Sequence, residues 1–167
     1  MSHDYDPNWD YPVVEIDHPC LELSDSTQTA LKKCITEARE SLLPLMNFSE
    51  GMDVFFVEPG GLGLGVIAIY CIGTYSKPVV GFDIDAIQSL CKEEGMGFIT
   101  QFELSLSHEL GHAYQESVGL NENHKRGFNE EDAEEFARCW VDEGVVRVDV
   151  LSSKLKKVSP KKNRQPM

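Results

Sequence analysis

Two histidines and a glutamate near the middle of the chain have the types and the spacing of a metal site. His108 and His112 are four residues apart, and Glu109 directly follows the first of them. On an α-helix, positions i and i+4 lie on the same face, so both imidazoles would reach one metal ion about 2.0–2.1 Å away. Glu109 would lie beside the ion without ligating it, where it can accept a proton from metal-bound water. The motif therefore predicts a hydrolytic metal centre.

The flanking residues predict that this motif lies well inside one helix. A long apolar lead-in begins at Phe98, and Gly119 follows as a stop signal, so the helix is expected to end at Ser117 or Val118. Gly111 places a small residue beside the second histidine, where a neighbouring backbone or a substrate can come close.

Residues 108–112 read HELGH and resemble the active helix of the zincin metallopeptidases. The metzincin branch is excluded, because Gln115 and Val118 stand where its pattern has glycine and histidine. The gluzincin branch takes its third zinc ligand from a glutamate on a later helix. The resemblance implies one Zn²⁺ per chain and an α+β minimal zincin fold. In that fold a small twisted mixed β-sheet lies over the active helix, and a glutamate helix follows.

A second helix is predicted to begin at Asn129, an N-cap residue followed by acids that the helix dipole favours. Its apolar stripe recurs at helical spacing and comprises Ala133, Phe136, Ala137, Trp140, Val141 and Gly144. On a helical wheel Glu130 is the acid closest to this stripe and Glu134 lies at its margin. The remaining acids, Glu131, Asp132 and Glu135, are expected to point to the side or away.

The resemblance to the gluzincins implies that Glu130 is the third metal ligand. It also implies that Glu134 does not ligate the metal but hydrogen-bonds one of the ligating histidines. The family usually has aspartate where this chain has Glu134. Other gluzincin registers place the ligand at Glu131 or Asp132, and these two alternatives stay open. The small Ala133 would let this helix pack closely against the active helix.

The scaffold around these two helices is expected to combine a small sheet with two further helices. Periodicity and turn residues predict helices at 27–43 and 85–93, and strands at 52–57, 64–72 and 79–84. The glycine run 60–65 is expected to form a hairpin turn. In the zincins the edge strand of such a sheet holds the substrate chain in extended form.

The charge of the chain is unevenly distributed. Residues 1–150 hold 9 Lys and Arg against all 28 Asp and Glu, a net charge of −19, whereas residues 151–167 hold 6 Lys and Arg and no acid. A body this acidic argues against a nucleic-acid-binding surface. We expect an extended acidic arm over 1–23, a zincin-like metallopeptidase domain over 24–150 and a basic flexible tail over 151–167. An acidic partner, or the body itself, could contact this tail.

The cysteines and the apolar segments indicate in which cellular compartment the protein is expected. The five cysteines are scattered without a C-x-x-C pair, which favours reduced thiols in a cytoplasmic protein over a disulfide framework. No apolar run approaches the length of a membrane span, and no signal sequence is recognisable at the start.

The predicted function is zinc-dependent hydrolysis of a protein or peptide substrate, with Glu109 as the general base. The alternative from a different class is a zincin scaffold that serves as a regulatory or protein-binding module, with zinc structural or absent. A third reading, peptide deformylase, would need a cysteine ligand, but Met96 follows Glu94-Gly95 where that cysteine would stand.

Overall fold

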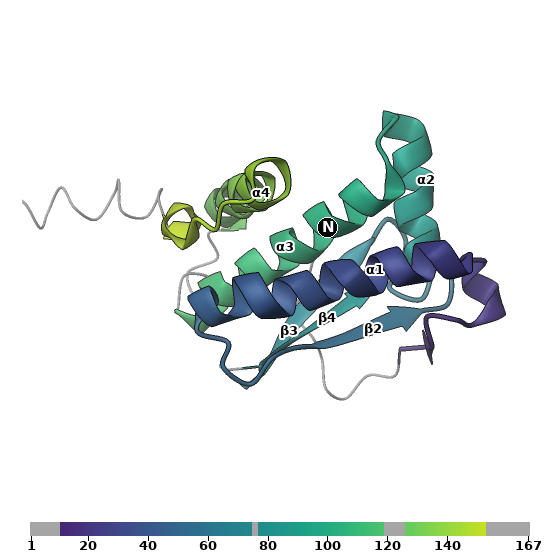
Figure 1. Ribbon diagram of the computed structural model, residues 1–167, viewed down its shortest axis with the longest axis horizontal. Coiled ribbons are helices and arrows are strands. Elements are labelled where there is room, and N and C mark those ends of the chain that lie inside the picture. Colours follow the sequence, from purple (N-terminus) through teal and green to yellow (C-terminus); the bar gives the residue numbers. More distant parts are fainter. Residues whose placement is uncertain (1–10, 75–76, 119–125, 153–167) are drawn as a thin grey trace, which may run out of the picture.

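The computed structural model describes residues 11–74, 77–118 and 126–152 (Figure 1). Four α-helices and a four-stranded sheet make up this part of the chain, so the α+β class is confirmed. The first ten residues of the predicted arm, residues 119–125, and the predicted tail from residue 153 lie outside the described residues.

The sheet is small and mixed, as predicted. Its strands are β1 (Val13–Val14), β2 (Asp53–Val57), β3 (Ala68–Thr74) and β4 (Lys77–Phe82), in the order β1-β2-β4-β3. Strand β2 pairs parallel with β4, while β1 pairs antiparallel with β2 and β3 antiparallel with β4. Strand β3 therefore lies at one end of the sheet.

Two predictions about the glycine-rich segment before β3 are wrong. The strand expected from residue 64 begins at Ala68, because Gly63 and Gly65 adopt φ values of 106° and 78° and the side chain of Leu64 is fully exposed. The glycine run is not a hairpin turn either. Strand β4 lies between β2 and β3, so the run connects two strands that do not pair.

The first helix begins where it was expected but ends differently. Helix α1 (Asp25–Glu37) is capped by Ser24, whose Oγ accepts from the backbone N–H of Thr27 at 3.2 Å. The chain then continues through the π-helical turn η2 (Ala38–Leu42) into the 3₁₀ helix η3 (Leu43–Met46). Pro44 directly follows the predicted helix 27–43 and lies in the first turn of η3, where its missing N–H costs nothing.

Helix α2 (Ile84–Glu94) follows β4 directly and is capped by a buried aspartate. One carboxylate oxygen of Asp83 accepts from the N–H of Ala86 at 3.0 Å, and the other accepts from the N–H of Gly60 at 2.8 Å. The same side chain therefore caps α2 and holds the turn after β2. Gly95 ends the helix in the left-handed conformation.

Helix α3 (Phe98–Ser117) matches the predicted range and lies at the centre of the molecule (Figure 1). One side packs on the sheet, where the rings of Phe82 and Phe102 have their centroids 4.5 Å apart. Another side packs on α4 (Arg126–Glu143), which is followed by the 3₁₀ helix η4 (Val148–Ser152). Helix α4 begins before the predicted start, so Asn129 lies within the helix and is not its N-cap.

The contact between α3 and α4 depends on small residues. A Cβ atom added at Gly111 would lie 3.4 Å from Cβ of Ala133 and 3.1 Å from Cδ2 of Leu151. Gly111 and Ala133 thus permit the close approach that the sequence suggested for both. Leu151 is itself fully buried.

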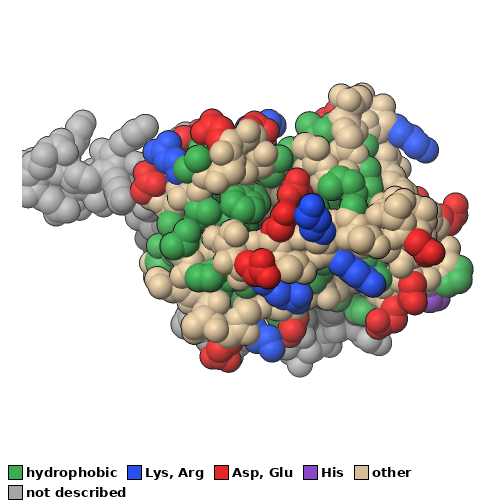
Figure 2. Space-filling model, in the orientation of Figure 1, with side chains coloured by type: hydrophobic (Ala, Val, Ile, Leu, Met, Phe, Trp, Pro, Cys, Tyr) green, Lys and Arg blue, Asp and Glu red, His purple; other side chains and the backbone are tan. Residues whose placement is uncertain are grey.

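The described surface carries charges of both signs. On the face that shows α1, acidic and basic side chains are interspersed (Figure 2). Among the described residues, no helix combines the length and the apolar character needed to cross a membrane. In the same part of the chain Cys20, Cys34, Cys91 and Cys139 are free thiols.

Candidate metal centre

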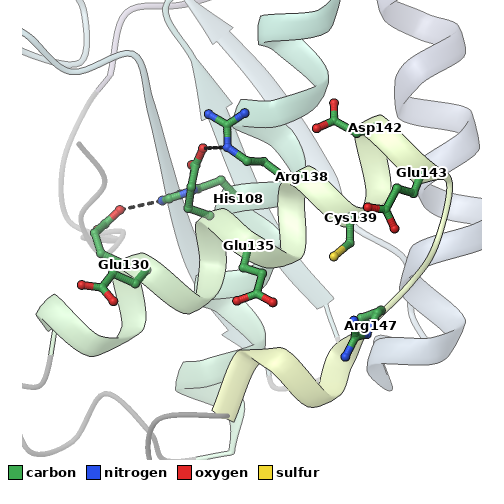
Figure 3. Close-up of a pocket in the computed structure, with 10 residues that line it drawn as sticks. His108, Glu130, Glu135, Arg138, Cys139, Asp142, Glu143 and Arg147 are labelled. Carbon is green, nitrogen blue, oxygen red and sulfur yellow. Dashed lines mark hydrogen bonds and ion pairs between the residues drawn. The ribbon is translucent and has the colours of Figure 1, made fainter.

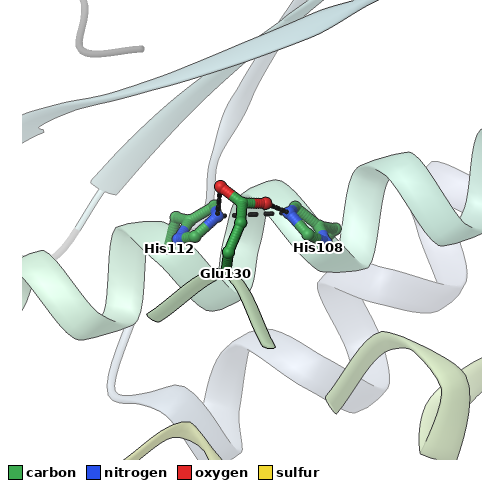
Figure 4. Close-up of side chains that lie close together, drawn as sticks. All are labelled: His108, His112 and Glu130. Carbon is green, nitrogen blue, oxygen red and sulfur yellow. Dashed lines mark hydrogen bonds and ion pairs between the residues drawn. The ribbon is translucent and has the colours of Figure 1, made fainter. Parts of the chain in front are cut away.

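Three side chains from α3 and α4 converge on one point (Figure 4). Oε1 of Glu130 lies 2.7 Å from Nε2 of His108, and Oε2 of Glu130 lies 3.2 Å from Nε2 of His112. The two Nε2 atoms are 3.1 Å apart. The helical spacing of the histidines brings their rings together, and the packing of α4 on α3 brings the carboxylate to them.

This group has the dimensions of a metal site. Ligand atoms arranged tetrahedrally around a metal at about 2.0–2.1 Å lie about 3.3 Å from one another. One ligand atom from each of the three residues can be chosen so that all lie within 4.8 Å of one another. Two imidazoles and a carboxylate suit a divalent transition metal ion. His108, His112 and Glu130 can therefore hold a metal ion.

Only one of the three acids left open by the sequence reaches the histidines. Glu130 does so, whereas the neighbouring Glu131 is exposed on α4 and lies outside the metal-ligand group found among the described residues. Asp132 is also outside that group but is 3% exposed, so its predicted outward orientation is wrong. A helical wheel assumes one buried face, whereas α4 packs against both α3 and η4.

Glu134 contacts the opposite ring nitrogen of His108. Its Oε1 lies 3.2 Å from Nδ1 of His108, and its Oε2 lies 2.8 Å from Nε of Arg138. A carboxylate can only accept, so Nδ1 of His108 carries the proton in this contact. Nε2 of His108 also faces a carboxylate, that of Glu130 at 2.7 Å, so both nitrogens donate when the ring is charged. A metal ligated at Nε2 would leave the ring proton at Nδ1, where Glu134 accepts it.

His112 is held by two neighbours that the sequence did not single out. Its Nδ1 lies 2.9 Å from Oε1 of Gln115, and Nε2 of Gln115 donates to the backbone oxygen of Leu151 at 3.0 Å. The ring of Tyr70 in β3 stacks on the imidazole, with centroids 5.8 Å apart and planes 23° apart. The i, i+3 spacing of His112 and Gln115 was a usable signal, but nothing local pointed to Tyr70 or Leu151.

The two glutamates beside His108 favour the protonated, positively charged form of its ring. Burial lowers the pKa of His108, but hydrogen bonds to Glu130 and Glu134 outweigh it and raise the pKa to about 9. The bond from His108 is the largest cause that lowers the pKa of Glu130. The same histidine lowers the pKa of Glu134, and Arg138 adds to that effect.

Glu109 is 4% exposed and lines a cavity of about 330 Å³ that also reaches His108 and Glu130. The cavity has an apolar wall, formed by Ile67, Leu90, Met96 and Leu104. A carboxylate beside a cluster of metal-binding side chains, in a space of this size, can take up and return protons during hydrolysis.

An open hollow runs along α4 from the same cluster (Figure 3). Arg138 and Arg147 are its basic lining residues, and its acidic ones are Glu130, Glu131, Glu134, Glu135, Asp142 and Glu143. Acids therefore outnumber bases beside the candidate centre, so the hollow favours cations over anions.

No protein-family model, curated protein or solved structure matches the chain. The likeness to the zincins therefore rests on residues 108–112 and on the geometry of the cluster.

Proposed function

We propose that the protein is a zinc-dependent metallopeptidase of the zincin type. The observation that supports this most is the convergence of His108, His112 and Glu130 within 4.8 Å, with Glu109 lining the adjoining cavity. Two imidazoles and one carboxylate make up a ligand set used by catalytic zinc, which keeps a fourth position open. Each histidine presents Nε2 to the centre, because Nδ1 is engaged by Glu134 in one case and Gln115 in the other.

When bound, zinc would supply a Lewis acid that lowers the pKa of water to about 7. The carboxylate of Glu109 would accept a proton from the attacking water and then deliver it to the leaving nitrogen of the peptide. Its position at the wall of the cavity, beside His108, suits both transfers. Burial of the residue to 4% exposure keeps competing bulk water away from it.

The substrate would lie between the sheet and α4. Within the described residues β3 pairs with β4 alone, so its other edge can receive an extended peptide by β-strand addition. Strand β3 also packs on α3, the helix that carries both histidines. Ile67, which directly precedes β3, belongs to the wall of the cavity that holds Glu109. A peptide paired with β3 would thus pass the metal centre.

The test combines metal content with turnover. Zinc per chain is measured by elemental analysis in the wild type, Glu130→Ala and Glu131→Ala, each purified without chelator or histidine tag. We expect about one zinc in the wild type and in Glu131→Ala, and a strong loss in Glu130→Ala, because Glu130, unlike Glu131, belongs to the group formed with His108 and His112. Glu131→Ala is a matched control, since it removes an adjacent acid from the same helix.

Turnover is measured on fluorescence-quenched peptides of randomised sequence, with Glu109→Gln as the test variant. We expect this variant to keep its zinc and to lose nearly all hydrolysis. Full hydrolysis by Glu109→Gln would overturn the role of Glu109. A zinc-loaded wild type that cleaves none of these peptides would favour the protein-binding module instead.

A further inference from the structure

The side chain of Gln115 is fully buried and joins two distant parts of the chain. Its Nε2 donates to the backbone oxygen of Leu151 at 3.0 Å, and its Oε1 lies 2.9 Å from Nδ1 of His112. A backbone oxygen can only accept, so Leu151 determines which end of the amide faces His112. His112 must then donate its Nδ1–H to Gln115, which leaves the lone pair of the neutral ring at Nε2.

Leu151 is held in place from a second direction. Its side chain is fully buried, and its Cδ2 lies 3.1 Å from the position of a Cβ at Gly111, the residue that directly precedes His112. Residues 148–152 of η4 are therefore seated on α3 next to a metal ligand. The backbone oxygen of Leu151 reaches Gln115 from this seat.

The two histidines are supported by separate elements. The Nδ1 partner of His108 is Glu134, a side chain 44% exposed on α4. The Nδ1 partner of His112 is Gln115, whose orientation depends on η4. Loss of α4 contacts would disturb His108 and Glu130, whereas undocking of η4 would disturb His112.

We infer that Gln115 is a positioning residue that couples metal binding at His112 to the docking of η4 on α3. This inference rests on the proposal that the site binds zinc. A hydrogen bond that orients a ligating histidine typically contributes about 10- to 100-fold to metal affinity. Coupling is reciprocal, so zinc must stabilise the docked η4 by the same factor by which a docked η4 strengthens zinc binding.

The first measurement uses the zinc-free wild type and needs no variant. Long-range ¹H–¹⁵N correlation spectra, recorded where the ring is neutral, report which nitrogen of His112 carries the proton. We expect the proton at Nδ1. A neutral ring that carries its proton at Nε2, the nitrogen 3.2 Å from Oε2 of Glu130, and none at Nδ1 would overturn the inference, because Gln115 would then not orient the ring.

The second measurement compares zinc affinity, by competition with a chromogenic chelator, in the wild type, Gln115→Met and Gln28→Met. Methionine matches the size of glutamine without its amide. We expect Gln115→Met to bind zinc about 10- to 100-fold more weakly. Gln28→Met is the matched control. The side chain of Gln28, on α1, also donates to a backbone oxygen, that of Leu23, at 3.1 Å, and it lies away from the metal-ligand group. Equal affinity in all three proteins would overturn the inference.

The third measurement follows hydrogen exchange of the Val150 amide, which donates to the backbone oxygen of Arg147 within the η4 turn at 3.1 Å. Zinc should slow this exchange in the wild type, and exchange unchanged by bound zinc would contradict the coupling. A wild type that binds no zinc at all would overturn the proposed function. The protonation of His112 in the zinc-free protein would still report on the contact between Gln115 and His112 alone.

Discussion

Glu134 lies 3.2 Å from Nδ1 of His108, on the opposite side of the imidazole from Glu130, which lies 2.7 Å from Nε2. The two glutamates are one helical turn apart on α4, so both point to the same face. One helix therefore provides a candidate ligand and the group that orients another. The two histidines on α3 are four residues apart, and so are the two acids on α4 that contact them.

The contact between Glu134 and His108 predicts a weaker metal site when it is removed. Glu134→Ala should lower zinc affinity about 10- to 100-fold, because Nδ1 of His108 loses its acceptor and the ring its orientation. Chelator competition measures the affinity. Glu135→Ala is the control, since it removes the next acid of the same hollow without touching a histidine. An equal loss in both variants would mean that general negative charge, not this contact, matters.

Zinc should also stabilise the fold. A ligand that binds only the folded state, at a free concentration 100 times its Kd, adds about 2.7 kcal/mol to the free energy of unfolding. For a chain of this length we expect the thermal midpoint to rise by about 5–10 °C on addition of zinc. Differential scanning calorimetry measures the shift. His112→Ala should abolish it, and a shift of equal size in that variant would place zinc elsewhere on the molecule.

The close contact at Gly111 predicts sensitivity to size. Alanine should have a small net effect, because the crowding of its Cβ against Cδ2 of Leu151, 3.1 Å away, offsets the helix preference of about 1 kcal/mol for alanine over glycine. Valine adds two further methyl groups against Leu151 and Ala133, and overpacking of this kind costs about 1–3 kcal/mol. Urea unfolding measures the difference. Gly111→Val as stable as the wild type would show that α4 and η4 can move apart at little cost.

Glu103 on α3 predicts a pH dependence away from the metal centre. Burial raises its pKa above 4.5, Glu37 raises it further, and a hydrogen bond with Cys34 opposes them. The folded state then holds this proton more tightly than the unfolded state. Ionisation of Glu103 therefore costs the fold stability as pH rises through 4.5, and the loss is complete above the pKa of the folded state.

Glu103→Gln removes this loss, so its stability relative to the wild type should improve as the pH rises from below 4.5 to above the raised pKa of Glu103. Urea unfolding at several pH values gives the difference in the free energy of unfolding. Glu40→Gln, at an exposed position, serves as the control. A difference between Glu103→Gln and the wild type that does not change with pH would contradict the shift.

Local patterns in the sequence were sufficient to predict much of the frame. The apolar lead-in and the stop at Gly119 predicted α3 over residues 98–117, and turn residues predicted α2 within one residue at each end. The 3.6-residue period puts His108 and His112 on one face regardless of the rest of the fold. Such predictions hold because they depend only on backbone geometry within a few residues.

The third member of the cluster depended on tertiary structure. The helical wheel and the gluzincin resemblance favoured Glu130 but left Glu131 and Asp132 open, and the position at which α4 crosses α3 brings Glu130 to the histidines. Gly111 permits that crossing, because a Cβ there would crowd Ala133 and Leu151, residues far apart in the chain. The same packing buries Asp132, which a one-sided helical wheel cannot foresee.

By itself, then, the sequence determined the two histidines, the glutamate beside them and the helix that carries all three. Only the tertiary structure brought Glu130 to both rings, set Tyr70 against His112 and joined Gln115 to Leu151. The physical reason is the range of the forces involved. Helical spacing acts over one turn, whereas the partners of each imidazole are chosen by how closely separate elements can pack.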